Sequence, residues 1–348
     1  GFMQQDNLHG FSESRKHLSI AKMDNPSGHP APELSFLAAD QSNDGFLLQF
    51  QAMASTCELL IDLPESHWAL AEQLALQVVR ETWRIEFKFS RYQTGNWHDK
   101  VHQNRGHWQN LDEESTRLIT FADQAWQLSN GLFDITSGIL RQVWRFDGSD
   151  RLPEPEQVES LLPQIGWQKV QWSLPEDDGV NSKPAQLYLP EGMELDFGGV
   201  GKEYAVDRVL GLSLSLLQKT QPDVACSLLV NFGGDIACSG PRANGAPWKV
   251  GIETPDREGK EAALLSLTGG ALATSGDSQR YLLKEGKRYS HLLNPKTGWP
   301  IENAVRSITV AAPTCSQGGL ISSLALLQGA EAEDLLKQTG LKYWLLSA

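Results

Sequence analysis

Residues 194–209 read Glu-Leu-Asp-Phe-Gly-Gly-Val-Gly-Lys-Glu-Tyr-Ala-Val-Asp-Arg-Val, and the interpretation of the chain starts from them. Leu195 and Phe197 alternate with polar neighbours as in a short strand. Glycines follow, and from Tyr204 to Leu217 apolar residues recur at the spacing of a helix. The stretch therefore predicts a strand, a glycine turn and a helix in direct succession.

This arrangement suits an anion. Backbone N–H groups at the turn and the dipole of the helix both favour negative charge, and glycines let a ligand approach the backbone closely. Lys202 adds a positive charge at the helix start. We therefore predict a phosphate-binding turn formed by Gly198, Gly199 and Gly201, with a plain turn and a solvated lysine as the alternative.

The stretch differs from the better-known phosphate motifs. A dinucleotide fingerprint requires a third glycine where Tyr204 stands. A P-loop requires glycine at Asp196 and Ser or Thr at Glu203. Neither motif is present.

Composition limits the classes of partner. The 348 residues are 40% hydrophobic, which is enough for one large domain or two subdomains. A net charge of −13 argues against nucleic acid, because phosphate contacts need clustered Lys and Arg. An anionic cofactor would have to be held locally, by backbone amides and a few basic residues.

Cysteines and histidines give no strong metal signal. Cys57, Cys226, Cys238 and Cys315 are widely spaced, lack zinc spacing and are interpreted as buried thiols. His98 and His102 are four residues apart and would share one face of a helix, as two metal ligands could. We expect residues 93–104 to be irregular, however, and favour loop or surface histidines.

The pattern of polar and apolar residues bears on the N-terminal segment and on whether the chain spans a membrane. Residues 1–45 are polar and lack periodicity, so we expect a flexible segment preceding a domain over 46–348. No apolar run is long enough to span a membrane. The opening Gly-Phe favours a trimmed leader and thus a periplasmic or membrane-anchored protein, with a cytoplasmic location as the alternative.

The order of predicted elements is α+β. Strands are expected over 46–63 (a pair), 166–170, 227–231, 248–253, 264–267, 271–273, 307–311 and 343–346, with a hairpin at Glu285-Gly286. Helices are expected over 66–88, 113–128, 155–162, 319–327 and 331–337. Hairpins and helices mix without regular βαβ alternation, which favours α+β.

Glycine-bearing turns with a neighbouring polar residue recur at strand ends, and here the chain resembles a known family. In order and spacing, the segments resemble the signature blocks of the ApbE family of FAD:protein FMN transferases. These segments are 53–56, 89–92, 133–138, 144–146, 166–170, 195–207, 230–236, 273–281 and 289–300. The resemblance covers about residues 46–330.

The resemblance implies an α+β fold with two T-fold-like subdomains and a flavin groove between them. Family members cleave the FAD pyrophosphate with magnesium, attach FMN to a Thr or Ser of a flavoprotein and release AMP, and some act as FAD pyrophosphatases. His291 would accept the hydroxyl proton and Lys202 would lie near the phosphates. The implied flavin-binding positions are Met53, Tyr92, Asp134, Gly198, Gly199, Gly201, Lys202, Tyr204, Asp207, Gly234, Asp235, Ser275, Gly276 and Asp277.

The implied magnesium site departs from the family pattern. Gly319 stands at the position of the family's metal-binding Asp, which leaves the Ser323 hydroxyl and the Gly201 carbonyl as implied ligands. Magnesium prefers anionic oxygen ligands, so the loss of the carboxylate weakens the site. Glu203 is a candidate replacement, and a solvated glutamate that favours the helix dipole is the alternative.

Two classes of function follow. The first is an active, magnesium-dependent flavin transferase acting on a Thr- or Ser-containing flavoprotein, with a flavoprotein of a membrane redox complex as one candidate acceptor. The second is an FAD-binding protein, or an FAD pyrophosphatase, that has lost transfer chemistry because of Gly319. Turnover of FAD to AMP separates binding from catalysis.

Overall fold

The computed structural model describes residues 14–37, 44–147, 149–253, 261–276 and 281–346. The chain divides into two compact units, each assembled from separate stretches. Unit 1 comprises Gly1–Phe87, Gly201–Thr274 and Ala311–Gly318, and unit 2 comprises Lys88–Val200, Ser275–Val310 and Gly319–Ala348. Helices and mainly antiparallel strands mix in both, which confirms the predicted α+β class.

Unit 1 is built on an antiparallel sheet with the strand order β1-β2-β3-β4-β10-β11-β14. These strands are β1 (Arg15–His17), β2 (Glu33–Leu37), β3 (Gly45–Ala52), β4 (Ser55–Asp62), β10 (Ser227–Phe232), β11 (Asp235–Cys238) and β14 (Gly270–Gly276). A separate pair, β12 (Trp248–Glu253) and β13 (Glu261–Leu267), also belongs to this unit.

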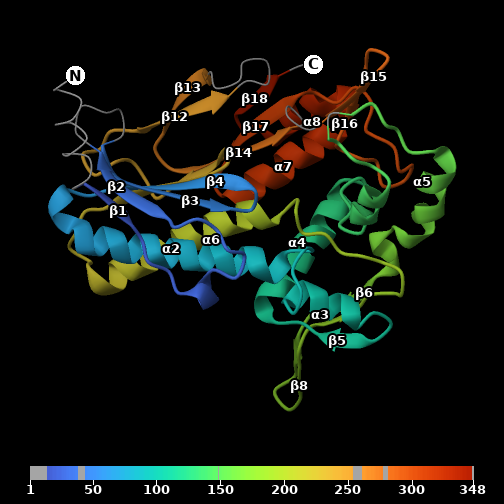
Figure 1. The fold of residues 1–348 in the computed structure, drawn as a ribbon, viewed down its shortest axis with the longest axis horizontal. Coiled ribbons are helices and arrows are strands. Elements are labelled where there is room, and N and C mark those ends of the chain that lie inside the picture. Colours follow the sequence, from blue (N-terminus) through green and yellow to red (C-terminus); the bar gives the residue numbers. More distant parts are fainter. Residues whose placement is uncertain (1–13, 38–43, 148, 254–260, 277–280, 347–348) are drawn as a thin grey trace. The chain divides into compact units, whose positions relative to one another are not determined.

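Two long helices, α2 (Trp68–Phe89) and α6 (Gly201–Thr220), run along one face of this sheet (Figure 1). The face is apolar because β3 and β4 alternate: Phe46, Leu48 and Phe50 are buried, while Gln49 and Gln51 are not. Arg208 Nε on α6 lies 3.4 Å from Glu81 Oε1 on α2. The hydrophobic face therefore holds both helices against the strands.

Unit 2 contains more helix and shorter strands. Its helices are α3 (Trp97–Gln103), α4 (Glu113–Leu128), α5 (Pro155–Leu161), α8 (Ala332–Thr339) and most of α7 (Cys315–Leu327). Its strands are β5 (Trp108–Asn110), β6 (Gln171–Ser173), β9 (Gln186–Tyr188), the β7–β8 hairpin (Glu176–Asp177 and Ser182–Lys183), the β15–β16 hairpin (Tyr281–Lys284 and Lys287–Ser290), and β17 (Ser307–Ala312) paired with β18 (Tyr343–Leu346).

Trp144 is central to one hydrophobic cluster of unit 2. Its side chain is 2% exposed and packs with Leu140, Val158 and Ile165. Its indole Nε1–H donates a hydrogen bond of 2.8 Å to the carbonyl of Gly298. This bond fixes the turn at residues 294–298 onto the cluster, and the segment with His291 precedes that turn.

Several predicted elements differ from the structure. Residues 195–197 form no strand, although Leu195 and Phe197 are buried as the alternation predicts. A helix, α3, occupies 97–103 where we expect irregular chain, and its N-cap is Asn96. The predicted strand start at 166–170 is a 3-10 turn over Trp167–Lys169, with β6 following.

The N-terminal part also contributes to the fold. Strands β1 and β2 lie within residues 1–45, and β2 pairs along its length with β3. Composition predicts a flexible segment up to residue 45, whereas 15–17 and 33–37 are strands in the sheet. Within the described ranges, no helix is both long and apolar enough to cross a membrane.

Candidate functional site

The predicted site residues fall into one group in each unit. Unit 1 holds Met53, Gly201, Lys202, Tyr204, Asp207, Gly234 and Asp235. Unit 2 holds Tyr92, Asp134, Gly198, Gly199, Ser275, Gly276, His291 and Ser323. Asp277 lies outside the described residues.

Two tight turns meet at one end of the unit 1 sheet. Because β4 pairs with β10, with Cys57 opposite Phe232, the β3–β4 and β10–β11 turns lie next to each other. Gly233 has a φ of 61°, and a Cβ on it would lie 2.6 Å from Ser55 Oγ and 3.2 Å from Lys202 Nζ. Glycine is therefore required here, because its lack of a side chain lets the turn and the lysine come close.

Lys202 forms an ion pair with a buried acid. Its Nζ lies 3.3 Å from Oδ2 of Asp235, which is 1% exposed. Thr274 N–H also donates to Asp235 Oδ1, at 3.2 Å. Burial raises the pKa of Asp235 above its usual range, and it lowers that of Lys202, but the charges of Asp235 and Glu203 outweigh it and raise the Lys202 pKa. The ammonium is thus charged and held in place at the start of α6.

Glu203 lies in the same cluster, and the expectation of a solvated side chain is wrong. Its Oε2 is buried and accepts no hydrogen bond within the described part of the chain. Burial and the charge of Asp235 raise the pKa of Glu203 to about 8. At neutral pH the carboxyl is therefore mostly protonated, which relieves the repulsion between the two acids.

Asp207, one turn further along α6, has a structural contact that the sequence did not indicate. Its carboxylate accepts the backbone N–H groups of Cys315 and Ser316, both at 2.8 Å, and so caps α7. Tyr204 is half-buried on α6, and Met53 is half-buried in the β3–β4 turn. Asp207 therefore ties α6 to the start of α7 within unit 1.

In unit 2, Asp134 is a buried acceptor. Its Oδ1 accepts the N–H of Thr136 at 2.8 Å and the hydroxyl of Thr136 at 2.6 Å, while Oδ2 accepts the N–H of Trp167 at 2.9 Å. The Thr136 hydroxyl oxygen in turn accepts the N–H of Gly166 at 2.8 Å. These bonds join two loops, so the carboxylate of Asp134 already has a structural role.

The segment before the glycine turn is held by side chains. Asp196 forms an ion pair with Arg141 (Oδ2 to Nη1, 2.8 Å), and its Oδ1 accepts the N–H of Gly198 at 2.8 Å. Gly198 and Gly199 are both exposed. The turn is therefore accessible, as a backbone anion site requires.

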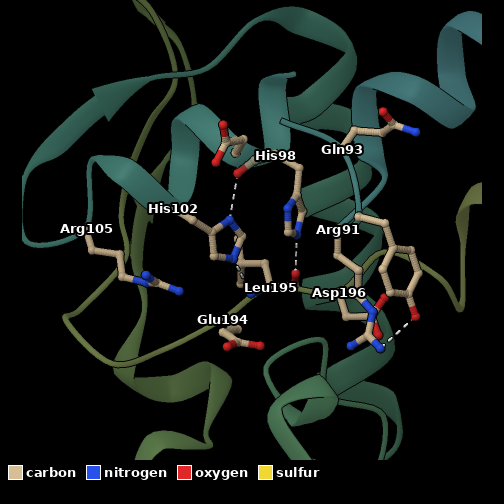
Figure 2. Close-up of a pocket in the computed structure, with 10 residues that line it drawn as sticks. Arg91, Gln93, His98, His102, Arg105, Glu194, Leu195 and Asp196 are labelled. Atoms are coloured by element: carbon tan, nitrogen blue, oxygen red, sulfur yellow. Dashed lines mark hydrogen bonds between the residues drawn. The ribbon is translucent and has the colours of Figure 1, made fainter. Parts of the chain in front are cut away.

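A pocket of about 280 Å³ lies beside this segment. Figure 2 shows the residues that line it. Within it, His98 Nε2–H donates to the carbonyl of Leu195 at 2.6 Å, and Leu195 N–H donates to His102 Nε2 at 2.9 Å. Burial lowers the pKa of both histidines, that of His102 to about 4, so both rings are neutral near pH 7. The two imidazoles thus bind the backbone N–H and C=O groups of Leu195. His98 is buried and His102 is half-buried on α3, so the prediction of loop or surface histidines is wrong for both.

Tyr92 lines the same pocket and is 78% exposed. Its hydroxyl accepts a bond of 2.8 Å from Arg91 Nη2, and the Arg91 guanidinium lies 4.8 Å from the ring centroid. An exposed aromatic ring that is held on one side by an arginine suits stacking with a planar ligand.

His291 follows β16 and is half-buried, with its ring edge-to-face against Phe146 at 6.5 Å. Ser275 Oγ lies 2.7 Å from Ser322 Oγ and 3.2 Å from Ser323 Oγ. Gly276 approaches Arg306 so closely that an added Cβ would lie 2.4 Å from its carbonyl oxygen. Ser323 therefore offers a hydroxyl that is already engaged with a neighbour.

The described residues do not make a metal site by themselves. Within them, no cluster of three or more His, Cys, Asp or Glu side chains could hold a metal ion. The implied ligands Gly201 and Ser323 belong to different units, and the position of Gly319 supplies no carboxylate. The residues present do not fit a magnesium ion held by the protein, and we derive no chemical step through one.

Several residues of the site gave no recognisable signal in the sequence. Glu86 accepts the N–H of Met53 from one turn before the end of α2, and Arg141 pairs with Asp196 from a 3-10 helix. Neither lies in a motif, because both act on backbone or side chains far away in the sequence. Only the Asn96 cap could have indicated α3 and hence the paired histidines.

Comparison with known proteins places the chain in a family. The FAD:protein FMN transferase of Salmonella typhimurium is 31% identical over 242 residues, which is 68% of this chain and 65% of that protein. The FAD:protein FMN transferase of Haemophilus influenzae is 29% identical over 243 residues, 68% of this chain and 66% of that protein. The chain thus spans just under two thirds of the length of these relatives.

Solved structures agree on the fold. The crystal structure of the ApbE protein of Thermotoga maritima matches with a TM-score of 0.71 and 28% identity, over 86% of this chain and 93% of that one. The apo flavinyl transferase ApbE of Pseudomonas stutzeri matches with a TM-score of 0.70 at 23% identity, over 87% and 90%, and shows likeness of fold. The ApbE family model matches residues 53–345. The chain therefore belongs to the ApbE family.

Proposed function

We propose that this protein is an FAD:protein FMN transferase, which attaches FMN from FAD to a Thr or Ser of a flavoprotein. The relatives named above carry this activity in their names. The observation that carries the proposal is the cluster around Lys202, where an ammonium paired with a buried acid stands at the start of a long helix beside two tight turns. Such a position suits a pyrophosphate.

The chemistry is a phosphoryl transfer. The acceptor hydroxyl oxygen forms a new bond to the phosphorus of the FMN half, the bond from that phosphorus to the oxygen of AMP breaks, and AMP leaves. Lys202 would neutralise charge on the phosphates, and His291 would accept the proton of the hydroxyl. Tyr92 would stack with a ring of the dinucleotide, since its exposed face is free of the Arg91 contact.

Magnesium dependence remains part of the proposal. Since the described residues supply no metal cage, the ion would depend on the phosphates of FAD and on water for most of its ligands.

A second candidate is an FAD-binding protein, or an FAD pyrophosphatase, without transfer activity. It is favoured by one observation, the glycine at position 319 where the family has its metal-binding carboxylate. Binding would be retained because the Lys202 cluster and Tyr92 do not depend on that residue.

The test is to incubate the purified protein with FAD and a Thr-containing flavoprotein domain, with and without magnesium, and to measure AMP and flavin attached to the acceptor. We expect magnesium-dependent AMP release with labelled acceptor, and its loss in His291→Ala with FAD binding retained. AMP without labelling would support the pyrophosphatase, and FAD binding without AMP would support the binding protein.

A further inference from the structure

The β3–β4 turn has an unusual backbone. Strands β3 and β4 pair up to Ala52 and Ser55, which leaves a loop of two residues, Met53 and Ala54. Their φ angles are 52° and 56°, a left-handed conformation at both positions. Hairpin loops of this kind favour Asn-Gly, because residues with a Cβ are unfavourable there. The surroundings must therefore hold this turn in place.

Helix α2 supplies the groups that hold it. The Glu86 carboxylate accepts the backbone N–H of Met53 through Oε2. Three residues earlier on α2, Trp83 Nε1–H donates to the carbonyl of Gln51 at 2.9 Å, at the end of β3. The turn and the strand that enters it are thus both anchored to one helix.

Glu86 is itself held by the N-terminal part of the chain. His29 Nε2 contacts Glu86 Oε1, and the His29 ring stacks on Trp83 with 5.5 Å between centroids and 26° between planes. Asn25 fixes His29, because its side chain accepts the His29 N–H and donates to the His29 carbonyl, both at 2.9 Å. Both residues precede the range 53–345 that matches the family.

We propose that Glu86 is a positioning residue that holds the Met53–Ala54 turn in its left-handed conformation for flavin binding, with His29 as its support. The link to flavin rests on the proposed function and on Met53 as one of the flavin-binding positions that the family resemblance implies. The turn also leads into Ser55, which lies beside Gly233 and Lys202. A shift of the turn would therefore disturb the position of the lysine as well as that of Met53.

The experiment compares Glu86→Ala, Glu86→Gln, His29→Ala and the double variant Glu86→Ala/Ala54→Gly. Glu72→Ala is the matched control, since Glu72 also lies on α2 and pairs with the N-terminal part (Lys16 Nζ, 2.7 Å), but it lies near the start of the helix, whereas Glu86 lies near its end. One readout is hydrogen exchange of the amides of residues 50–57 without ligand. The other is the dissociation constant for FAD.

We expect Glu86→Ala to lose protection at the Met53 amide and to bind FAD about tenfold more weakly, with His29→Ala showing a smaller loss. Glu86→Gln keeps an acceptor and should lie between the wild type and Glu86→Ala. Glycine accepts a left-handed φ freely, so Ala54→Gly should restore most of the FAD affinity in the double variant. Glu72→Ala should behave as the wild type in both readouts.

The two readouts separate this inference from the proposed function. If the wild type does not bind FAD, the proposed function is wrong, and so is the role of the turn in flavin binding. The hydrogen-exchange data still test whether Glu86 holds the turn. If Glu86→Ala keeps the protection of Met53, or binds FAD as the wild type does, the positioning role is overturned. A double variant as weak as Glu86→Ala would show that the conformation of the turn is not what matters.

Discussion

Substitution of Glu203 by Gln should change how stability depends on pH. In the unfolded chain this carboxyl ionises near its ordinary pKa of 4.5, and in the folded protein near about 8. Between these values the folded state holds more protons than the unfolded state, so the free energy of unfolding falls as pH rises. The wild type should therefore lose stability between pH 5 and 8.5, and Glu203→Gln should lose less because it cannot ionise.

The magnitude follows from the difference in pKa. A difference of about 3.5 units corresponds to at most about 5 kcal/mol. Part of the Glu203 side chain reaches solvent, although its Oε2 is buried, so we expect about 2–3 kcal/mol. For a chain of this size that is a difference in Tm of about 3–4 °C at the alkaline end.

The assay is thermal unfolding followed by tryptophan fluorescence at half-unit steps from pH 5 to 8.5. The quantity to compare is the slope of Tm against pH, because other groups titrate in both proteins and cancel in the difference. Glu65→Gln, at an exposed carboxylate, should leave the slope unchanged. Parallel curves for the wild type and Glu203→Gln would refute the buried acid cluster.

Three further substitutions test other parts of the structure. Asp207→Ala removes the acceptor for the first two N–H groups of α7 and should destabilise by about 2 kcal/mol, measured as a drop in Tm. His102→Ala should lower Tm at pH 7 but flatten the loss of stability between pH 6.5 and 4. In that range the wild type loses about 2 kcal/mol, because its unfolded state binds the proton that the folded ring, with a pKa of about 4, excludes. Trp144→Phe leaves the buried Gly298 carbonyl without its donor and should cost about 2–3 kcal/mol in urea unfolding, whereas an unchanged midpoint would argue against the bond.

The sequence predicted elements well where local signals agreed. For the helix expected over 113–128, the preceding Asp112 caps α4 and its carboxylate accepts the N–H of Ser115. After the helix, Asn130 and Gly131 adopt positive φ, a conformation that Asn and Gly favour at helix ends. Glu285 and Gly286 likewise form the β15–β16 turn. At these places the backbone conformation is set by neighbours in the sequence, so it can be read from them.

Residues 195–197 show why other predictions failed. Alternation predicts a strand, and the burial of Leu195 and Phe197 follows it. A strand also needs a neighbouring strand for its N–H and C=O groups, but those of Leu195 are bound by His102 and His98. These histidines lie on α3, about 95 residues earlier in the sequence, and nothing in the sequence near Leu195 indicates that they bind it.

The sequence indicated which residue types form the candidate site, but it did not indicate their contacts or their charge states. Lys202 and Asp235 were identified, but their contact depends on Gly233, whose missing side chain admits the lysine. For Glu203 the sequence left two possibilities, a replacement metal ligand and a solvated glutamate that favours the helix dipole, and neither anticipates a buried carboxyl with a raised pKa. Its burial results from the packing of α6 on the sheet, which is a tertiary effect.

Two kinds of energetically unfavourable feature in unit 1, a strained turn and buried acids, lie close to Lys202. The left-handed Met53–Ala54 turn is costly for residues with a Cβ, and Glu203 and Asp235 are acids whose raised pKa values mean that burial destabilises their charged forms. Selection for stability alone would favour Asn-Gly in the turn and a neutral side chain at position 203. Backbone strain and perturbed carboxyls tend to persist together where function requires them. The strained turn and the perturbed carboxyls therefore support the proposed site at the start of α6 on physical grounds, without reference to the family likeness.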